Sequence, residues 1–347
     1  MRHMFEPALV NGPFGDPGLF VDFRDERRAL LLDLPDLAAL PPRKLLRVSH
    51  VFVSHAHMDH FNGFDRLLRV VLGRKVRVTL TGGPGFVAQV EHKLRAYTWN
   101  VVQHYEVALT LDVREVRPDG SGARASFCSL TGFAREGEGA FAADGDVLHD
   151  EAVFRVRGRF VDHGVPCLAF AVEEKARVAL GRDRIEAMGY GTGAWLRALK
   201  AAVLAGAPDD TPIDVCWRDR AGDHAAQRTV GDLRALVLDV GPGRRIGYAT
   251  DLRYTAANLD ALAALLDGVD ELFVESVFLA ADVDHATRKH HLTARQAGEI
   301  ARRVGAKLVV PFHFSPRYEG RGAELVAEVE AARGPEGRTR GCPECAR

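Results

Sequence analysis

Hydrophobic positions along the chain follow two spacings, one typical of buried strands and the other of amphipathic helices. In the first third, apolar runs predict strands at 29–34, 45–53 and 76–80. Helical spacing predicts helices at 64–72 and after Gly85, and the segment 106–173 is mostly β-like. The last third alternates again, with strands expected at 246–250, 271–275 and 306–312 and helices at 258–266, 293–304 and after Glu319. This alternation predicts an α/β sandwich.

Two segments do not share this pattern. The first 28 residues look irregular, with no clear strand or helix spacing. The segment 181–230 combines GYGTG, a helical stretch at 195–206, a loop-like PDDTP and a polar run at 218–228. We interpret this segment as an insertion or a docking arm. The chain is therefore expected to form a single domain over 1–335, with an insertion at about 181–230 and a tail at 336–347.

The charge and composition exclude several classes of protein. The 347 residues include 46 basic and 47 acidic side chains, so a general polycation is excluded and nucleic-acid binding needs a local basic face. No uncharged apolar run is long enough to cross a bilayer, and the first residues lack the apolar core of a secretory signal. Five cysteines in a chain of this length do not form a disulfide framework. We therefore expect a cytoplasmic protein without membrane contact.

The segment SHAHMDH at 54–60 carries the strongest chemical signal in the sequence. It follows a predicted buried strand, and residues two apart in an extended chain project to one side, so His55 and His57 can bind one ion. A turn would then bring Asp59 and His60 to a second ion beside the first. Imidazole and carboxylate ligands suit zinc or another first-row divalent metal. The alternative is a surface histidine cluster, which the position at the end of a buried strand disfavours.

Further ligands must come from distant parts of the chain, and three residues stand out by their position. His163, Asp251 and His313 each follow a β-like run, where functional loops gather in α/β folds. Each taken alone would more often be structural, as a turn-capping aspartate or a histidine bonded to the backbone. Their shared position at strand ends makes them candidate ligands.

These residues, in this order, resemble the metallo-β-lactamase superfamily. The stretches DHGVPCLAFAVEE (162–174) and HLTARQAGEIARRVGAKLVVPFHFSPRY (291–318) are similar to ribonuclease Z, a family of zinc phosphodiesterases that trim tRNA 3′ ends. The resemblance implies a four-layer αββα sandwich with two metal ions at the edge between its sheets. It also implies the residues that hold them: His55, His57 and His163 for the first ion, Asp59, His60 and His313 for the second, and Asp251 bridging both.

The resemblance also implies a proton relay. Glu275 in FVES and His291 in HHLTA match the relay residues of the family. We expect His291, held by Glu275, to protonate the leaving ribose oxygen, while Asp59 orients or deprotonates the water that becomes the metal-activated hydroxide. His285 and His290 compete for the role of His291. Alternatively, all three histidines are solvated loop residues.

The sequence departs from the family in regions that would bind substrate. The family's N-terminal strand is not legible, and the Pro-Gly-Pro element of its tRNA-binding arm is replaced by the Gly-Thr-Gly at 191–193. Trp195, Arg197 and Lys200 would give the arm a basic, base-stacking surface. A plain amphipathic helix covering the sandwich is the alternative. Arg317 is expected either to bind substrate phosphate or to form a structural ion pair.

Three functions are open from the sequence. The first is a ribonuclease Z-like phosphodiesterase that processes the 3′ ends of tRNA precursors with two divalent ions, zinc first and manganese as the alternative. The second keeps the metals but acts on another small substrate, such as a phosphodiester, thioester or lactone. The third is a non-catalytic RNA-binding homologue. A homodimer is expected from the family alone, and Cys342 with Cys345 supplies only half of a zinc site.

Overall fold

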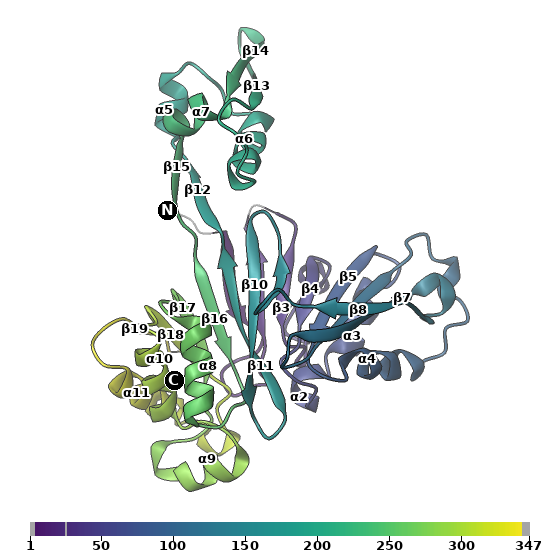
Figure 1. Cartoon of the computed structure of the whole chain (residues 1–347), viewed down its shortest axis with the longest axis vertical. Coiled ribbons are helices and arrows are strands. Elements are labelled where there is room, and N and C mark those ends of the chain that lie inside the picture. The colour runs from purple at the N-terminus through teal and green to yellow at the C-terminus, as the bar shows by residue number, and fades with distance from the viewer. Residues whose placement is uncertain (1–3, 25, 342–347) are drawn as a thin grey trace. The chain divides into compact units, whose positions relative to one another are not determined.

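The computed structural model describes residues 4–24 and 26–341, and these form two compact units (Figure 1). The larger unit comprises residues 5–148, 156–172 and the chain from 245 onward. The smaller unit comprises Met4, residues 149–155 and residues 173–244. The predicted pair Cys342 and Cys345 lies outside the described residues. Of the sequence-predicted site residues, only Trp195, Arg197 and Lys200 belong to the smaller unit.

The first half of the chain builds an eight-stranded sheet in which sequence order is also spatial order. The central strands β3 to β6 are parallel, and the outer pairs are antiparallel. The strands are β1 (Phe5–Leu9), β2 (Leu19–Phe23), β3 (Ala29–Leu32), β4 (Val48–Phe52), β5 (Arg77–Gly82), β6 (Thr110–Val116), β7 (Ser121–Cys128) and β8 (Arg135–Ala142). The helices among them are α1 (Pro42–Leu45), α2 (Met58–Phe61), α3 (Phe64–Val71) and α4 (Phe86–Arg95).

A seven-stranded sheet forms the other half of the sandwich, with the order β19-β18-β17-β16-β11-β10-β9. Its strands are β9 (Val147–Asp150), β10 (Phe154–Asp162), β11 (Pro166–Glu174), β16 (Arg245–Ala249), β17 (Glu271–Glu275), β18 (Leu308–Phe312) and β19 (Arg338–Thr339). The strands β16 to β19 are parallel to one another. The helices that connect them are α8 (Ala256–Leu266), α9 (Val283–Lys289), α10 (Ala294–Arg303) and α11 (Gly322–Arg333).

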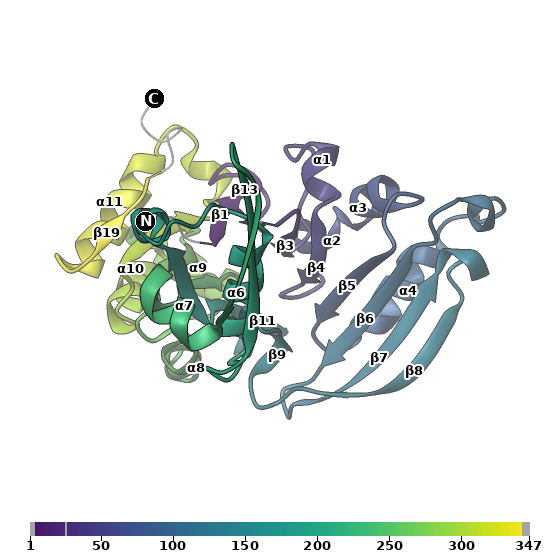
Figure 2. The same cartoon turned by 90° about the horizontal axis from the view of Figure 1, so that it is seen from above.

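Helices pack against both sheets, and each sheet shares a hydrophobic core with its helices. Phe64 of α3 and Phe86 of α4 are buried in one core with the apolar face of the first sheet, and Figure 2 shows α4 against β6 and β7. Helices α8, α10 and α11 share a second core with the other sheet. Between the sheets, the rings of Phe52 and Phe170 lie 6.0 Å apart. The predicted α/β sandwich is confirmed.

The smaller unit contains a segment, residues 176–242, that we call the arm. The two ends of the arm, β12 (Ala176–Leu180) and β15 (Leu238–Pro242), pair as a two-stranded ribbon (Figure 1). The arm has a hydrophobic core of its own, to which Leu199, Val215 and Leu233 contribute. Its other elements are α5 (Arg182–Ala187), α6 (Ala194–Leu204), β13 (Pro212–Asp219), β14 (Gly222–Thr229) and α7 (Val230–Val237).

Two segments differ from the pattern read from the sequence. The segment 5–23 is not irregular as expected, because β1 and β2 form an antiparallel pair with Phe5 opposite Phe23. The polar run at 218–228 lies mostly in the β13–β14 hairpin, where alternate residues such as Ile213 and Val215 are buried and their neighbours face solvent. No helix in the described part of the chain combines the length and the apolar character that a bilayer span needs.

Candidate metal centre

The predicted metal ligands lie in loops that follow strands of the two sheets. His55 and His57 follow β4, His163 follows β10, Asp251 follows β16 and His313 follows β18. The short helix α2 begins directly after His57 and carries Asp59 and His60. The strand ends bring side chains from four separated segments of the larger unit to one edge of the sandwich, where open α/β sheets place their ligands.

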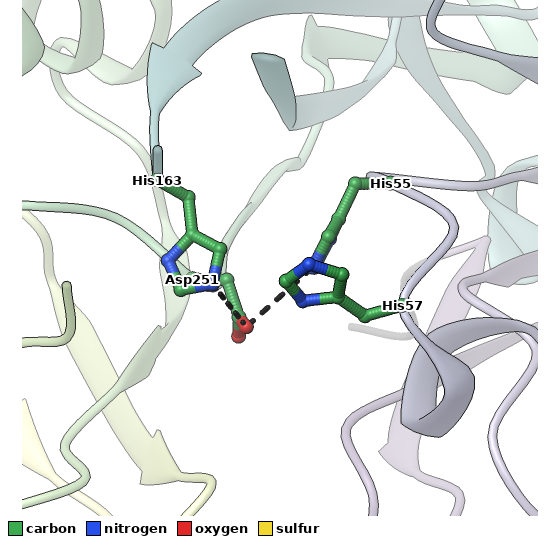
Figure 3. A group of neighbouring side chains, drawn as sticks. All are labelled: His55, His57, His163 and Asp251. Atoms are coloured by element: carbon green, nitrogen blue, oxygen red, sulfur yellow. Dashed lines mark ion pairs between the residues drawn. The ribbon is translucent and has the colours of Figure 1, made fainter. Parts of the chain in front are cut away.

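One group of side chains matches the first predicted metal set. His55, His57, His163 and Asp251 each offer a ligand atom, and these atoms all lie within 4.8 Å of one another (Figure 3). Nε2 of His163 lies 3.3 Å from Oδ2 of Asp251, and Nε2 of His55 lies 3.7 Å from the same oxygen. The rings of His55 and His57 are 4.2 Å apart. The alternation of an extended chain therefore places both imidazoles beside one carboxylate oxygen.

The second predicted set gathers around the other oxygen of Asp251. Oδ1 of Asp251 lies 3.1 Å from Nδ1 of His313 and 3.4 Å from Nε2 of His60. Asp59 Oδ2 lies 3.5 Å from Nε2 of His60 and 3.7 Å from Nε2 of His313. Asp251 thus stands between the two sets and turns one oxygen to each, which is the arrangement that a bridging ligand needs.

The same edge offers a further combination of ligands. Asp251, Glu275, His291 and His313 also present ligand atoms that all lie within 4.8 Å of one another. The resemblance assigns Glu275 and His291 to a proton relay rather than to a metal. The two roles predict different metal contents for variants of His291.

The buried nitrogens of the site fit divalent cations. Nε2 of His55, Nε2 of His60 and Nδ1 of His313 are buried and have no hydrogen-bond partner. Unpartnered buried polar atoms are rare in folded proteins, because each costs free energy that a ligand can recover. Burial, and after it the charge of His60, lowers the pKa of His55 to about 3. Its imidazole is therefore neutral at pH 7, as metal ligation requires.

Asp33 supports the site from outside the ligand sets, and sequence reasoning missed it. This fully buried carboxylate accepts hydrogen bonds from Nδ1 of His60 at 2.9 Å and from the Tyr248 hydroxyl at 2.9 Å. It also accepts from the backbone N–H of Ser54 at 2.6 Å and from the Ser54 hydroxyl at 3.0 Å. These bonds fix the His60 ring so that its free Nε2 faces Asp251. The available signal was an acidic residue within the apolar run at 29–34.

Backbone strain is concentrated at this edge. Among the described residues, five that are not glycine have a positive φ: Asp33, Phe133, Asp251, His290 and His313. All but Phe133 belong to the centre or touch one of its ligands. The left-handed conformation costs free energy for residues with a Cβ, and such residues gather at functional sites.

The predicted relay residues are in contact. Nδ1 of His291 donates to Oε2 of the fully buried Glu275 at 2.8 Å. The other carboxylate oxygen accepts from the backbone N–H groups of Leu252 and Leu292, at 3.0 and 3.1 Å. Although burial opposes the charged form, Glu275 raises the pKa of His291. The His291 ring is 5.4 Å from that of His313, so an acid stands next to the second ligand set.

The competing histidines lie elsewhere. The ring of His290 contacts Arg253 and the carbonyl oxygen of His163. His285 lies 3.3 Å from a guanidinium nitrogen of Arg317. Of these three histidines, the structure pairs His291 with Glu275.

Arg317, the predicted phosphate anchor, lies on the surface beside the relay. Its guanidinium stacks over the ring of Phe278 at 5.5 Å and lies 3.9 Å from Asp282. Both predicted roles, phosphate binding and a structural ion pair, are compatible with this position. A cavity of about 320 Å³ opens next to it, lined by His291, His313, Phe278, His285 and Lys289 among others.

The structure corrects one of the residues predicted for the arm. Trp195 is only 2% exposed, packs in the arm's core and donates its Nε1–H to the carbonyl oxygen of Gly191 at 3.0 Å. It is therefore not available for base stacking. Trp195 and Leu199 are four residues apart, as residues on one face of an amphipathic helix are, and this apolar face packs in the core of the arm. Arg197 is exposed and Lys200 is half-buried.

Comparison with known proteins decides the family. The chain is 32% identical to ribonuclease Z of Deinococcus radiodurans over 321 residues, which cover 91% of each protein. The chain belongs to the ribonuclease Z family. It is also 27% identical to ribonuclease Z of Geobacillus kaustophilus, over 84% of this chain and 78% of that protein. The family described as "Beta-lactamase superfamily domain" matches residues 214–314.

Solved structures show the same fold outside close sequence similarity. The short form of human tRNase Z covers 91% of this chain and 93% of its own length, with a TM-score of 0.52 and 18% identity. The metallo-β-lactamase fold protein YhfI from Bacillus subtilis covers 96% of this chain and 95% of its own length, with a TM-score of 0.53 and 15% identity. The ribonuclease Z fold of this chain is thus the metallo-β-lactamase sandwich predicted from the sequence.

Proposed function

We propose that this protein is a metal-dependent phosphodiesterase that cleaves tRNA precursors at their 3′ side. The observation that carries the proposal is that seven predicted ligands from four segments gather, with Asp251 between the other six, next to the His291–Glu275 pair. The curated relatives with which the chain aligns over most of its length bear the name ribonuclease Z. A non-catalytic RNA-binding protein would have no use for this arrangement.

The residues divide into two sets of ligands for divalent ions. His55, His57 and His163 would hold the first, and Asp59, His60 and His313 the second, with Asp251 between them. When bound, two such ions lower the pKa of a water molecule and neutralise charge on a phosphoryl oxygen. We propose zinc as the native metal, because imidazole and carboxylate ligands together suit it, with manganese as the alternative.

The chain's own residues would manage the protons of the reaction. Asp59 is part-exposed, and although burial opposes it, His60 lowers the pKa of this carboxyl to about 2. It is therefore ionised and can orient the attacking water. His291 is protonated more readily than a free histidine because Glu275 holds it, so it can donate a proton to the leaving ribose oxygen.

Substrate would be held by cationic side chains around this centre and by the arm. Lys289 lines the cavity that opens on His291 and His313, and we propose that Arg317, which contacts His285 of the same cavity, binds a backbone phosphate. Arg197 on the exposed face of α6, together with Lys200, would bind tRNA phosphates. A homodimer and a cytoplasmic location are further proposals that rest on the family and the composition.

A cleavage assay with three substrates tests the proposed function. Zinc- or manganese-loaded protein is incubated with a tRNA carrying a 3′ trailer, with bis-p-nitrophenyl phosphate and with a thioester. We expect cleavage of the precursor directly after the discriminator base, and no cleavage after chelation. Turnover of the small diester or of the thioester without precursor cleavage would replace the tRNA substrate by a small one. Metal binding without any turnover would refute the enzymatic function.

A further inference from the structure

His290 ends helix α9 in an unusual way for a histidine. Its φ of 62° lies in the left-handed region, and its backbone N–H donates to the carbonyl oxygen of Thr287 in the last turn of the helix. Glycine is the usual residue at such a helix end, because it has no Cβ to oppose this conformation. A histidine here needs compensation from its side chain.

The side chain and the carbonyl of His290 both contact the segment that holds His163. The His290 carbonyl oxygen accepts from Nδ1–H of His163 at 2.9 Å. In return, Nδ1–H of His290 donates to the carbonyl oxygen of His163 at 3.2 Å. The two residues, 127 positions apart in the chain, are therefore joined by a reciprocal pair of hydrogen bonds.

This pair of bonds determines which nitrogen of His163 is free. Because Nδ1 of His163 carries the proton that is donated to His290, Nε2 is left with a lone pair. Nε2 is the atom that lies 3.3 Å from Asp251 in the first ligand set. A hydrogen bond of this kind fixes both the tautomer and the direction of a ligating imidazole.

Arg253 holds the ring of His290 from the far side. One of its terminal nitrogens donates to Nε2 of His290 at 2.9 Å, and the other contacts Asp162 at 2.9 Å. The backbone N–H of Arg253 also donates to the carbonyl oxygen of Asp162 at 2.9 Å. Arg253 thus links His290 to the residue before His163 and stands two positions after Asp251.

The residue after His163 leaves room for this ring. Gly164 has a φ of 87°, and a Cβ added to it would lie 2.8 Å from Nδ1 of His290. The Gly164 N–H donates to Oδ1 of Asp162 at 2.7 Å, which fixes the loop in the shape that admits the His290 ring. The loop and the helix end are therefore fitted to each other on both sides of His163.

We propose that His290 is a positioning residue, which directs Nε2 of His163 to the first metal through its carbonyl while Arg253 holds its ring in place. The inference rests on the proposed metal centre and assigns a role to a histidine that the relay does not use. Asp162 and Gly164 shape the loop to which the His290 ring is fitted.

Zinc affinity tests this role without reference to RNA cleavage. His290→Gly keeps the carbonyl and suits the left-handed backbone, so it removes only the side chain that ties the carbonyl in place. We expect it to weaken binding of one of the two zinc ions by about 10- to 100-fold in competition with a chromogenic chelator. The melting temperature of the metal-free variant should not fall below that of the metal-free wild type. His104→Ala, a change at an exposed histidine outside the site, is the matched control and should bind zinc like the wild type.

A double-mutant cycle separates a shared network from independent effects. If Arg253 acts through His290, Arg253→Gln and His290→Gly combined should weaken zinc binding no more than the larger single change. Wild-type zinc affinity in His290→Gly, or effects that multiply in the double variant, would overturn the proposal. If the wild type binds two zinc ions but fails to cleave any tRNA precursor, the proposed function fails while this measurement remains decisive for His290.

Discussion

Asp251 is the residue on which the two halves of the metal centre depend. One of its oxygens faces His55 and His163, and the other faces His60 and His313. It is 2% exposed and held at a φ of 49°, and the Thr250 hydroxyl donates to it at 2.8 Å. A buried carboxylate surrounded by imidazoles is stable only when positive charge compensates it. Metal ions would supply that charge without requiring the histidines to be protonated.

The role of His291 is decided by a variant that separates metal binding from proton transfer. His291→Ala should leave two zinc ions bound while kcat for precursor tRNA falls by about 10²- to 10⁴-fold, because the acid for the leaving group is lost. The measurement pairs zinc content with single-turnover rates. Loss of one zinc ion would show instead that His291 is a ligand in the group with Asp251, Glu275 and His313.

The buried Tyr248 hydroxyl provides a test of the support that Asp33 gives to the site. Tyr248→Phe removes one of four hydrogen bonds to this carboxylate, and a bond to a charged group contributes about 1.5–3 kcal/mol. We expect the free energy of unfolding to fall by about that amount, measured by denaturant titration. Tyr105→Phe, at a residue 42% exposed, is the control and should unfold like the wild type. Equal free energies of unfolding for the two variants would show that the hydrogen bond from Tyr248 to Asp33 does not stabilise the fold.

At the scale of elements, the spacing of hydrophobic residues was enough to predict a helix or strand wherever the segment buries one continuous face. The predicted helix at 64–72 is α3, and the predicted strand at 271–275 is β17 with the same bounds. The predicted strand at 45–53 is shorter, because α1 extends to Leu45 and only 48–52 pair in the sheet. Strand and helix type follow from local burial, whereas the ends depend on pairing partners far away in sequence.

The missed strands have a physical reason in common. β1 and β2 are separated by the loop 10–18, and β1 becomes a strand by pairing with β2 rather than by its own pattern. In the arm, β13 and β14 bury one face against α6 and α7 and turn polar residues to solvent. The buried face carries only a few apolar residues, some of them small. Short strands of this composition carry little local signal, because side-chain packing against neighbours determines them.

The arm carries a prediction of its own about RNA binding. Arg197→Ala should weaken the affinity for precursor tRNA and reduce the magnitude of its salt dependence by about one unit of slope, because one phosphate contact is lost. Turnover of bis-p-nitrophenyl phosphate should be unchanged. Arg27→Ala, at an exposed arginine of the larger unit, serves as the control for lost charge. An unchanged salt slope in Arg197→Ala would remove Arg197 from the RNA-binding surface.

At the scale of the whole molecule, the side chains that gather at the candidate metal centre could be predicted from the sequence, whereas the residues that support them could not. The SHAHMDH segment and the strand ends at 163, 251 and 313 carry histidine and aspartate, which can bind metals, and their order along the chain resembles that of the family. Asp33 and His290 act through hydrogen bonds to partners 27 and 127 positions away in the chain. Contacts over such distances produce no recognisable motif in the sequence. For Trp195 the prediction was wrong: the neighbouring basic residues suggested a base-stacking surface, but the side chain packs in the core of the arm.

We propose that seven side chains, Asp251 and the six that surround it, hold two divalent ions. The most direct measurement is the zinc content per chain of the wild type and of Asp251→Ala after dialysis against trace zinc. We predict two zinc ions in the wild type and at most one weakly held ion in a folded Asp251→Ala variant, with folding checked by circular dichroism. A wild type that retains no zinc, or an Asp251→Ala variant that still retains two ions, would contradict the account.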